Sequence, residues 1–261
     1  MKFIPYVCCG DPNLDFTYKL VKTLAPYSYL IELGIPFSDP IADGKTIQGA
    51  SERALKSGAN TDKIFSMVET LRKEHIKTPF VFMTYYNIVY AYGRENFLQR
   101  MAKVGVQGII IPDLPFEEDK TFENLTEKYN ISIVNLISSN TQIDRSRKIL
   151  QKEKLFTYLV SVAGTTGART STSIESLKFV KSVKEFAQNL AKINNRKNNL
   201  FVGFGISNKE QSLEFIRAGA DGVIVGSKII NIYTKYIDKN GKLNEEEKAL
   251  SDVKGFVKNI I

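Results

Sequence analysis

Short apolar runs rich in β-branched residues recur along the whole chain and alternate with segments of helical spacing. The runs predict about eight strands, at residues 3–7, 29–35, 79–85, 108–112, 132–137, 156–162, 200–206 and 222–226. Apolar positions spaced by three and four residues predict helices between them, among them 14–24, 61–71, 96–104, 122–129, 145–150, 174–190 and 210–218. Strand followed by helix, repeated about eight times, predicts parallel strands joined by right-handed crossovers.

Two α/β architectures fit this alternation, an open doubly wound sheet and a closed (β/α)8 TIM barrel. The number of strands and the length of the chain favour the barrel. The first strand-to-helix turn, Gly10-Asp11-Pro12-Asn13, lacks the GxGxxG pattern of a dinucleotide-binding sheet. The longest polar interruption, 194–199, precedes a strand and is typical of a surface loop. We therefore expect one TIM-barrel domain over residues 1–261, with its chemistry at the carboxyl ends of the strands.

Charge and cysteine usage narrow the class of protein. The 261 residues include 36 Lys and Arg against 28 Asp and Glu, a formal net charge of +8. The basic residues are scattered along predicted helix faces, which favours a solvated surface or an anionic substrate over nucleic-acid binding. The longest apolar runs are too short for a membrane helix or a signal peptide. The neighbouring Cys8 and Cys9 disfavour an ordinary disulfide, so we expect a soluble, reducing compartment and no membrane association.

The sequence holds little material for metal or triad chemistry. The one histidine, His75, stands near the end of a predicted helix, where a solvated position is favoured. One histidine and two adjacent cysteines cannot supply a Cys/His metal cluster or a Ser-His-Asp triad. Acid–base chemistry is left to carboxylates, tyrosines or lysines, and we expect no metal.

Glu32 is the charged residue that the predicted strands explain least. A charge in a buried parallel strand is costly unless it is paired or functional. If Glu32 faces the barrel interior, Gly34 leaves space above it for a substrate. An apolar pocket raises the pKa of a carboxyl group, which suits a group that both donates and accepts protons. The alternative is an internal Glu bonded to a neighbouring Tyr or Lys.

Three predicted loops carry further candidates. Asp39 and Asp43, in the loop after the second strand, lie over the barrel mouth or make turn and N-cap hydrogen bonds. Glycine-rich segments end the seventh and eighth strands, at 203–207 and 222–228, where barrels bind phosphate; the alternative is two glycine-dependent turns. Small and hydroxyl residues at 163–173 predict a mobile lid or a disordered crossover.

Taken together, the motifs resemble the alpha chain of tryptophan synthase. The most specific is ELGIPFSDPIADG at 32–44. The others are FIPYV and GDP within 3–12, MTYYN at 83–87, IIIPDLPFEE at 109–118, YLVSVAGTTGAR at 158–169, VGFGIS at 202–207 and GVIVGS at 222–227. Their order and intervals match over nearly the whole chain.

The resemblance implies retro-aldol cleavage of indole-3-glycerol phosphate to indole and glyceraldehyde 3-phosphate, without metal or Schiff base. It makes Glu32 the catalytic acid and base, and Asp43 the partner of the indole N–H. It implies a substrate site of Tyr6, Ile47, Met83, Tyr85, Ile110, Tyr158, Thr166 and Phe204. Phosphate would be held by Gly167, Gly205, Gly226 and Ser227.

The same resemblance implies a partner, the pyridoxal-phosphate-dependent beta chain of an α2β2 assembly. Asp39 and the segment around Pro115 match positions at that contact, and no cofactor is expected in this chain. The sequence leaves two compartments open, the cytoplasm and a plastid stroma. The sequence departs from the family at its start, where a helix usually precedes the first strand, at the shorter join 25–28, and at Lys45 and Ile88, where proline is common.

Two other functions compete with this interpretation. Indole-glycerol-phosphate synthase and phosphoribosyl isomerase are phosphate-binding barrels that need a catalytic Lys, or an acid–base pair with Cys, at strand ends. The predicted strand ends offer only Lys45 and Lys228 near such places. A purely allosteric partner of a beta chain would have lost Glu32 or Asp43, and both are present.

Overall fold

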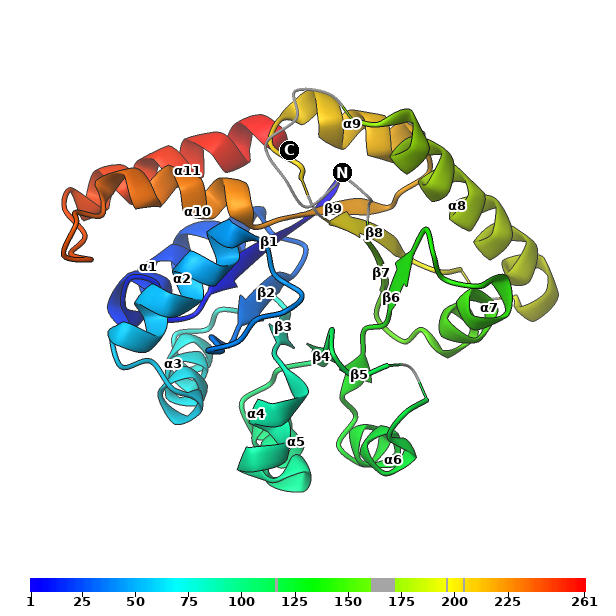
Figure 1. Ribbon diagram of the computed structural model, residues 1–261, viewed down its shortest axis with the longest axis horizontal. Helices are drawn as coiled ribbons and strands as arrows, with labels where there is room; N and C mark the ends of the chain where they lie inside the picture. The colour runs from blue at the N-terminus through cyan, green and yellow to red at the C-terminus, as the bar shows by residue number, and fades with distance from the viewer. Residues whose placement is uncertain (116, 161–171, 196, 204) are drawn as a thin grey trace.

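Strands occupy the centre of the computed structural model and helices surround them (Figure 1). The structure describes residues 1–115, 117–160, 172–195, 197–203 and 205–261. The described strands are all parallel to their neighbours, in the order β5-β4-β3-β2-β1-β9-β8-β7-β6. They are β1 (Lys2–Cys8), β2 (Ile31–Gly34), β3 (Phe80–Met83), β4 (Gly108–Ile110), β5 (Ser132–Ile133), β6 (Leu136–Ser138), β7 (Thr157–Val160), β8 (Leu200–Gly203) and β9 (Gly222–Val225).

The sheet closes because its two edge strands are halves of one extended segment. Only Val134 and Asn135 separate β5 from β6 in the chain. The Val134 N–H donates to the Ile109 carbonyl of β4 at 2.9 Å, and the Tyr158 N–H of β7 donates to the Asn135 carbonyl at 3.0 Å. The predicted strand 132–137 therefore joins both edges, and the prediction of a (β/α)8 barrel is confirmed. Because the strands are parallel, their carboxyl ends form one rim, called the mouth below.

Five of the described α-helices begin at a side-chain cap. The side chains of Asn13, Asn60, Asp119, Ser173 and Asn208 each accept a backbone N–H in the first turn of the following helix. All seven helices predicted above are present. The described helices are α1 (Leu14–Leu24), α2 (Lys45–Lys56), α3 (Thr61–Lys73), α4 (Tyr86–Tyr92), α5 (Arg94–Lys103), α6 (Lys120–Lys128), α7 (Ile143–Lys152), α8 (Ile174–Asn194), α9 (Lys209–Arg217), α10 (Ser227–Tyr233) and α11 (Glu246–Ile260), with 3-10 turns η1 (Ala25–Tyr27) and η2 (Thr234–Tyr236).

Two apolar cores sit on the two faces of the sheet. The larger core fills the layer between strands and helices. The smaller core fills the barrel interior and consists of Ile4, Leu30, Val81, Ile110, Val134, Phe156, Tyr158, Phe201 and Ile224. Alternate residues of a strand point to opposite faces, so membership of the smaller core identifies which positions face inward. None of the described helices combines the length and apolarity needed to span a membrane.

Candidate active site

Glu32 faces the barrel interior, which is the condition that the sequence analysis set for a substrate-facing role. It lies in β2 two residues after Leu30, which belongs to the interior core, and it pairs in register with Tyr6 of β1 and Val81 of β3. The residue is 1% exposed, and its Oε2 has no hydrogen-bond partner among the described residues. Burial, followed by the nearby charge of Asp43, raises the pKa of Glu32 to about 8.

The space beside Gly34 is filled by protein, which corrects the expectation that it holds substrate. A Cβ added to Gly34 would overlap the ring and hydroxyl of Tyr6. The glycine is needed because Tyr6, on the neighbouring strand, leans across it. A Cβ at Gly203 would likewise overlap the hydroxyl of Tyr158. Burial raises the pKa of both tyrosines; Cys8 raises that of Tyr6 further, and the charges of Glu32 and Asp43 contribute to the rise in both.

Asp43 is held by a tyrosine from another strand end. The Tyr85 hydroxyl donates to Asp43 Oδ2 at 2.9 Å and accepts the Ala42 N–H at 3.0 Å. Asp43 Oδ1 is buried without a hydrogen-bond partner among the described residues. Burial raises the pKa of Asp43 to about 6, and the Tyr85 hydrogen bond opposes the rise. Gly44, rather than Asp43, precedes α2 as its N-cap, so the N-cap alternative for Asp43 is wrong.

The other predicted substrate residues within the described chain lie around these groups. Met83 pairs in register with Gly34 and with Ile110, and both side chains contact the interior core. Ile47 is half-buried in the first turn of α2, directly after the Asp43 loop. Tyr85 is buried. An apolar wall of this kind fits a flat aromatic ligand, with the two carboxylates as its polar groups.

The residues predicted to bind phosphate follow two adjacent strands. Gly205 comes after β8 with a φ of +75°, a conformation that favours glycine, and Gly226 and Ser227 come after β9. Because β8 pairs with β9, these three residues lie on the same side of the mouth. Packing also favours glycine at position 226, since an added Cβ would stand 2.9 Å from the Tyr6 ring.

Thr166, Gly167 and Phe204 lie outside the described residues, as does most of the expected lid. At its end, Ser173 accepts the Ser176 N–H and so caps α8. His75 is exposed two residues after the end of α3, as expected, and Cys8 and Cys9 are free and buried. The described residues contain no group of three or more His, Cys, Asp or Glu placed to hold a metal ion.

Both predicted partner-contact positions are exposed on the mouth. Asp39 lies in the loop after β2, where its Oδ2 accepts the Ser38 hydroxyl at 2.5 Å, and Pro115 lies in the loop after β4. Apolar side chains are exposed at the same end of the barrel: Ile41 is 83% exposed, Ile143 71% and Ile174 65%. Ile143 and Ile174 are the first residues of α7 and α8, and in a barrel these helix starts follow the carboxyl ends of strands.

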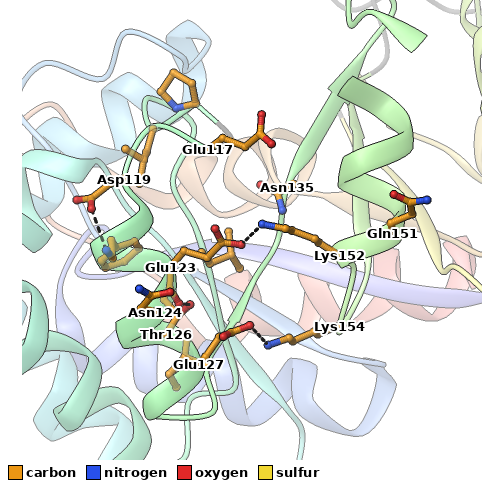
Figure 2. Close-up of a pocket in the computed structure, with 15 residues that line it drawn as sticks. Glu117, Asp119, Glu123, Asn124, Thr126, Glu127, Asn135, Gln151, Lys152 and Lys154 are labelled. Atoms are coloured by element: carbon orange, nitrogen blue, oxygen red, sulfur yellow. Dashed lines mark hydrogen bonds and ion pairs between the residues drawn. The ribbon is translucent and has the colours of Figure 1, made fainter. Parts of the chain in front are cut away.

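A pocket of about 350 Å³ outside the barrel extends from Leu114 and Pro115 to the space between α6 and α7 (Figure 2). Lys152 points across it to Glu123 of α6, and Lys154 points to Glu127, each pair joined by an ion pair. Because carboxylates already neutralise these two lysines, they do not give the pocket the free positive charge that an anionic substrate needs. The barrel mouth remains the candidate active site.

The turn after β1 carries a polar cluster that the sequence analysis missed. Asp11, Arg53 and Tyr233 come from three distant parts of the chain, and Arg53 and Tyr233 both donate hydrogen bonds to the Asp11 carboxylate. The motif Gly10-Asp11-Pro12 contained a signal, because an Asp within a buried segment needs a partner. Nothing in the local sequence named Arg53 or Tyr233 as that partner.

Comparisons with known proteins agree with this geometry. The sequence profile described as tryptophan synthase alpha chain matches residues 1–260. The tryptophan synthase alpha chain of Methanocaldococcus jannaschii is 42% identical over 246 residues, which cover 94% of this chain and 84% of that protein. The one from Methanococcus voltae is 40% identical over 260 residues, covering 98% and 88%.

A solved structure extends the similarity to three dimensions. A chain of the tryptophan synthase a2b2 complex from Pyrococcus furiosus superposes with a TM-score of 0.87 at 37% identity, covering 99% of this chain and 97% of that one. The fold, the motifs at the mouth and the full-length match lead to one conclusion: this chain belongs to the tryptophan synthase alpha chain family.

Proposed function

We propose that this alpha chain is a carbon–carbon lyase that cleaves indole-3-glycerol phosphate to indole and glyceraldehyde 3-phosphate. The observation that carries the proposal is a pair of carboxylates at the apolar mouth of the barrel, the buried Glu32 and the half-buried Asp43, each with one buried oxygen that has no partner among the described residues. Family membership supports a role in tryptophan synthesis, and the pair supplies the acid–base groups that this reaction requires.

The two carboxylates are suited to different tasks. With a pKa of about 8, Glu32 is mostly protonated at neutral pH and can donate a proton. With a pKa of about 6, Asp43 is mostly ionised and can accept a hydrogen bond from the indole N–H. Pairs of titratable groups whose environments separate their pKa values commonly divide the acid and electrostatic roles in this way.

The cleavage follows from that division. Glu32 protonates C3 of the indole ring, and the positive charge that develops on the ring nitrogen is stabilised by the Asp43 carboxylate. The bond from C3 to the glycerol carbon then breaks, its electron pair restores the aromatic ring, and the positively charged carbon loses its hydroxyl proton to become the aldehyde. Glu32, now ionised, accepts that proton. Atoms and charges balance without a metal or cofactor in this chain.

Phosphate recognition completes the site. We assign Gly205, Gly226 and Ser227 to the phosphate, because they end adjacent strands on one side of the mouth. Gly167 stays in this set, and Thr166 and Phe204 stay in the substrate set, by resemblance. The net charge of +8 favours the approach of an anionic substrate.

The exposed apolar residues support a partner on the mouth. Ile41, Ile143 and Ile174 surround the opening through which indole would leave, and Asp39 and Pro115 lie on the same rim. We assign this surface to a tryptophan synthase beta chain, since a relative of 37% identity forms an a2b2 complex whose subunits activate one another. Pyridoxal phosphate belongs to that partner.

Release of indole from indole-3-glycerol phosphate tests the proposal. Because the substrate also contains the indole ring, free indole is separated from it by solvent extraction before it is quantified. We expect slow release by the purified chain and a sharp rise when a tryptophan synthase beta chain is added. The control is Glu32→Gln, which should release no indole above background in either mixture. A folded wild-type chain that releases none with or without the partner contradicts the proposal.

A further inference from the structure

Asp11 is a buried carboxylate at the mouth that the proposed reaction does not use. It is 1% exposed and lies in the turn between β1 and α1. Arg53 donates to it twice, from Nε to Oδ1 at 2.7 Å and from Nη2 to Oδ2 at 2.8 Å. The Tyr233 hydroxyl donates to Oδ2 at 2.6 Å. Such bidentate, charge-assisted contacts fix geometry as well as charge.

The two partners of Asp11 belong to helices that begin at the candidate active site. Arg53 lies near the end of α2, whose first residue is two positions after Asp43. Tyr233 ends α10, whose first residue is Ser227. At 1.5 Å per residue, the network lies about 12 Å along α2 from its start and about 9 Å along α10 from its start. One carboxylate therefore joins the helix behind Asp43 to the helix behind the phosphate residues.

The turn that carries Asp11 is itself fixed against α1 and α2. The Gly10 N–H donates to Thr17 Oγ1 at 2.9 Å, and the Ser57 hydroxyl donates to the Gly10 carbonyl at 3.0 Å. A Cβ added at Gly10 would overlap Ala59 and stand 3.3 Å from the Ala54 Cβ. Because these contacts tie the turn to α1 and α2, a change at Asp11 should also affect the helices.

We propose that Asp11 is a positioning residue for the cleavage reaction, fixing α2 relative to α10 so that one substrate reaches Asp43 and the phosphate residues together. The inference rests on the proposed function. Indole-3-glycerol phosphate has its ring at one end and its phosphate at the other. Asp43 and the phosphate residues must therefore keep a fixed separation. A displacement of about 1 Å between such sets can reduce a rate on the order of a hundredfold.

A positioning role for Asp11 predicts a change in kinetics that damage to one contact set alone would not produce. A ligand that touches only one contact set, such as glycerol 3-phosphate, does not sense the separation of the two helices. A substrate that spans both sets does. Loosening the network should therefore lower kcat/KM for indole-3-glycerol phosphate while leaving the affinity for glycerol 3-phosphate nearly unchanged.

Two variants and one matched control test the inference. Asp11→Asn removes the charge, and Tyr233→Phe removes only the hydroxyl, because the ring keeps its edge contact with Phe16. The control is Glu153→Gln, which alters a buried, hydrogen-bonded carboxylate at the opposite end of the barrel. Cleavage and glycerol 3-phosphate binding are measured well below the Tm of each protein, by indole release and by calorimetry.

We expect kcat/KM to fall at least about tenfold in Asp11→Asn and about threefold in Tyr233→Phe, with the Kd for glycerol 3-phosphate within about twofold of wild type. Glu153→Gln should keep both values. If Asp11→Asn does not fold, Tyr233→Phe decides. Unchanged kcat/KM in Tyr233→Phe, or an equal loss in Kd and kcat/KM, overturns the inference. A folded wild-type chain that cleaves nothing overturns the proposed function instead.

Discussion

Each end of the barrel buries a glutamate, and the two carboxylates differ in their hydrogen-bond partners. Glu153, just before β7 at the amino end, is 3% exposed and accepts the Thr157 hydroxyl at 2.8 Å, the Asn198 amide at 3.2 Å and the Asn199 N–H at 3.0 Å. Glu32, at the carboxyl end, is 1% exposed and has an oxygen with no partner among the described residues.

The difference separates structure from chemistry. A buried carboxylate with several donors is stabilised in its charged form and joins the segments that supply them. A buried carboxylate with an unpartnered oxygen is destabilised in its charged form, so its pKa rises and its proton becomes available near neutral pH. The fold tolerates this cost at the mouth, where a substrate brings the missing contacts.

The largest expected effect is that of exchanging each glutamate for its amide. Glu32→Gln should lower kcat for indole release by about a thousandfold or more, because general acid–base catalysis contributes on that scale. Glu153→Gln should keep kcat and lower the free energy of unfolding by about 2 kcal/mol, through its lost charged hydrogen bonds. Indole release and urea unfolding measure both. Near-normal cleavage by folded Glu32→Gln would falsify the acid–base assignment.

Glu32 should also make the stability of the protein depend on pH. The folded pKa of Glu32, about 8, lies above the ordinary value of 4.5, so the folded state holds the proton longer than the unfolded state. The free energy of unfolding should therefore decrease as pH rises from 4.5 through 8, by at most about 5 kcal/mol from this group. Glu32→Gln should remove that decrease. Urea unfolding at pH 5, 7 and 9 measures it, and identical curves for variant and wild type contradict it.

Most of the fold was readable from the sequence because local pattern and tertiary role agree. Buried parallel strands gave β-branched runs, and apolar positions spaced by three and four residues gave the helix at 14–24, which is α1. The strand 132–137 also appeared in the pattern, but its division into two pairing halves did not. That division depends on which neighbour each half meets, and local sequence does not contain it.

The site was readable where one residue broke a pattern, and hidden where two distant residues had to meet. Glu32 stood out because a charge interrupts an apolar strand. The filling of the Gly34 niche by Tyr6 was not predicted, because it depends on the register between β1 and β2. The Asp11 network joins residues 42 and 222 positions apart, so spacing could not reveal it.

Asp43→Asn should lower the cleavage rate less than Glu32→Gln does. We expect kcat/KM to fall at least about tenfold, roughly 1.4 kcal/mol of transition-state stabilisation. The charge of Asp43 raises the pKa of Glu32, so its removal should move the alkaline limb of the pH profile to lower pH. Kinetics from pH 5 to 9 measure both effects. Asp39→Asn, an exposed aspartate of the same loop, should leave the isolated chain unchanged, and an unmoved limb in Asp43→Asn would remove the proposed coupling.

Tyr85→Phe should have the smallest effect and the most specific one. Its hydroxyl donates to Asp43 and holds the pKa of that carboxyl down, so losing it should raise the pKa of Asp43 above about 6. Cleavage needs Asp43 ionised, and kcat/KM falls as pH drops through this pKa. The acid limb should therefore move to higher pH, with about a fivefold loss at pH 6 and little loss at pH 8. Tyr86→Phe is the matched control, because the Tyr86 hydroxyl bonds Asp119 instead. Equal losses at both pH values would mean that Tyr85 contributes through packing, and that its hydroxyl does not set the pKa of Asp43.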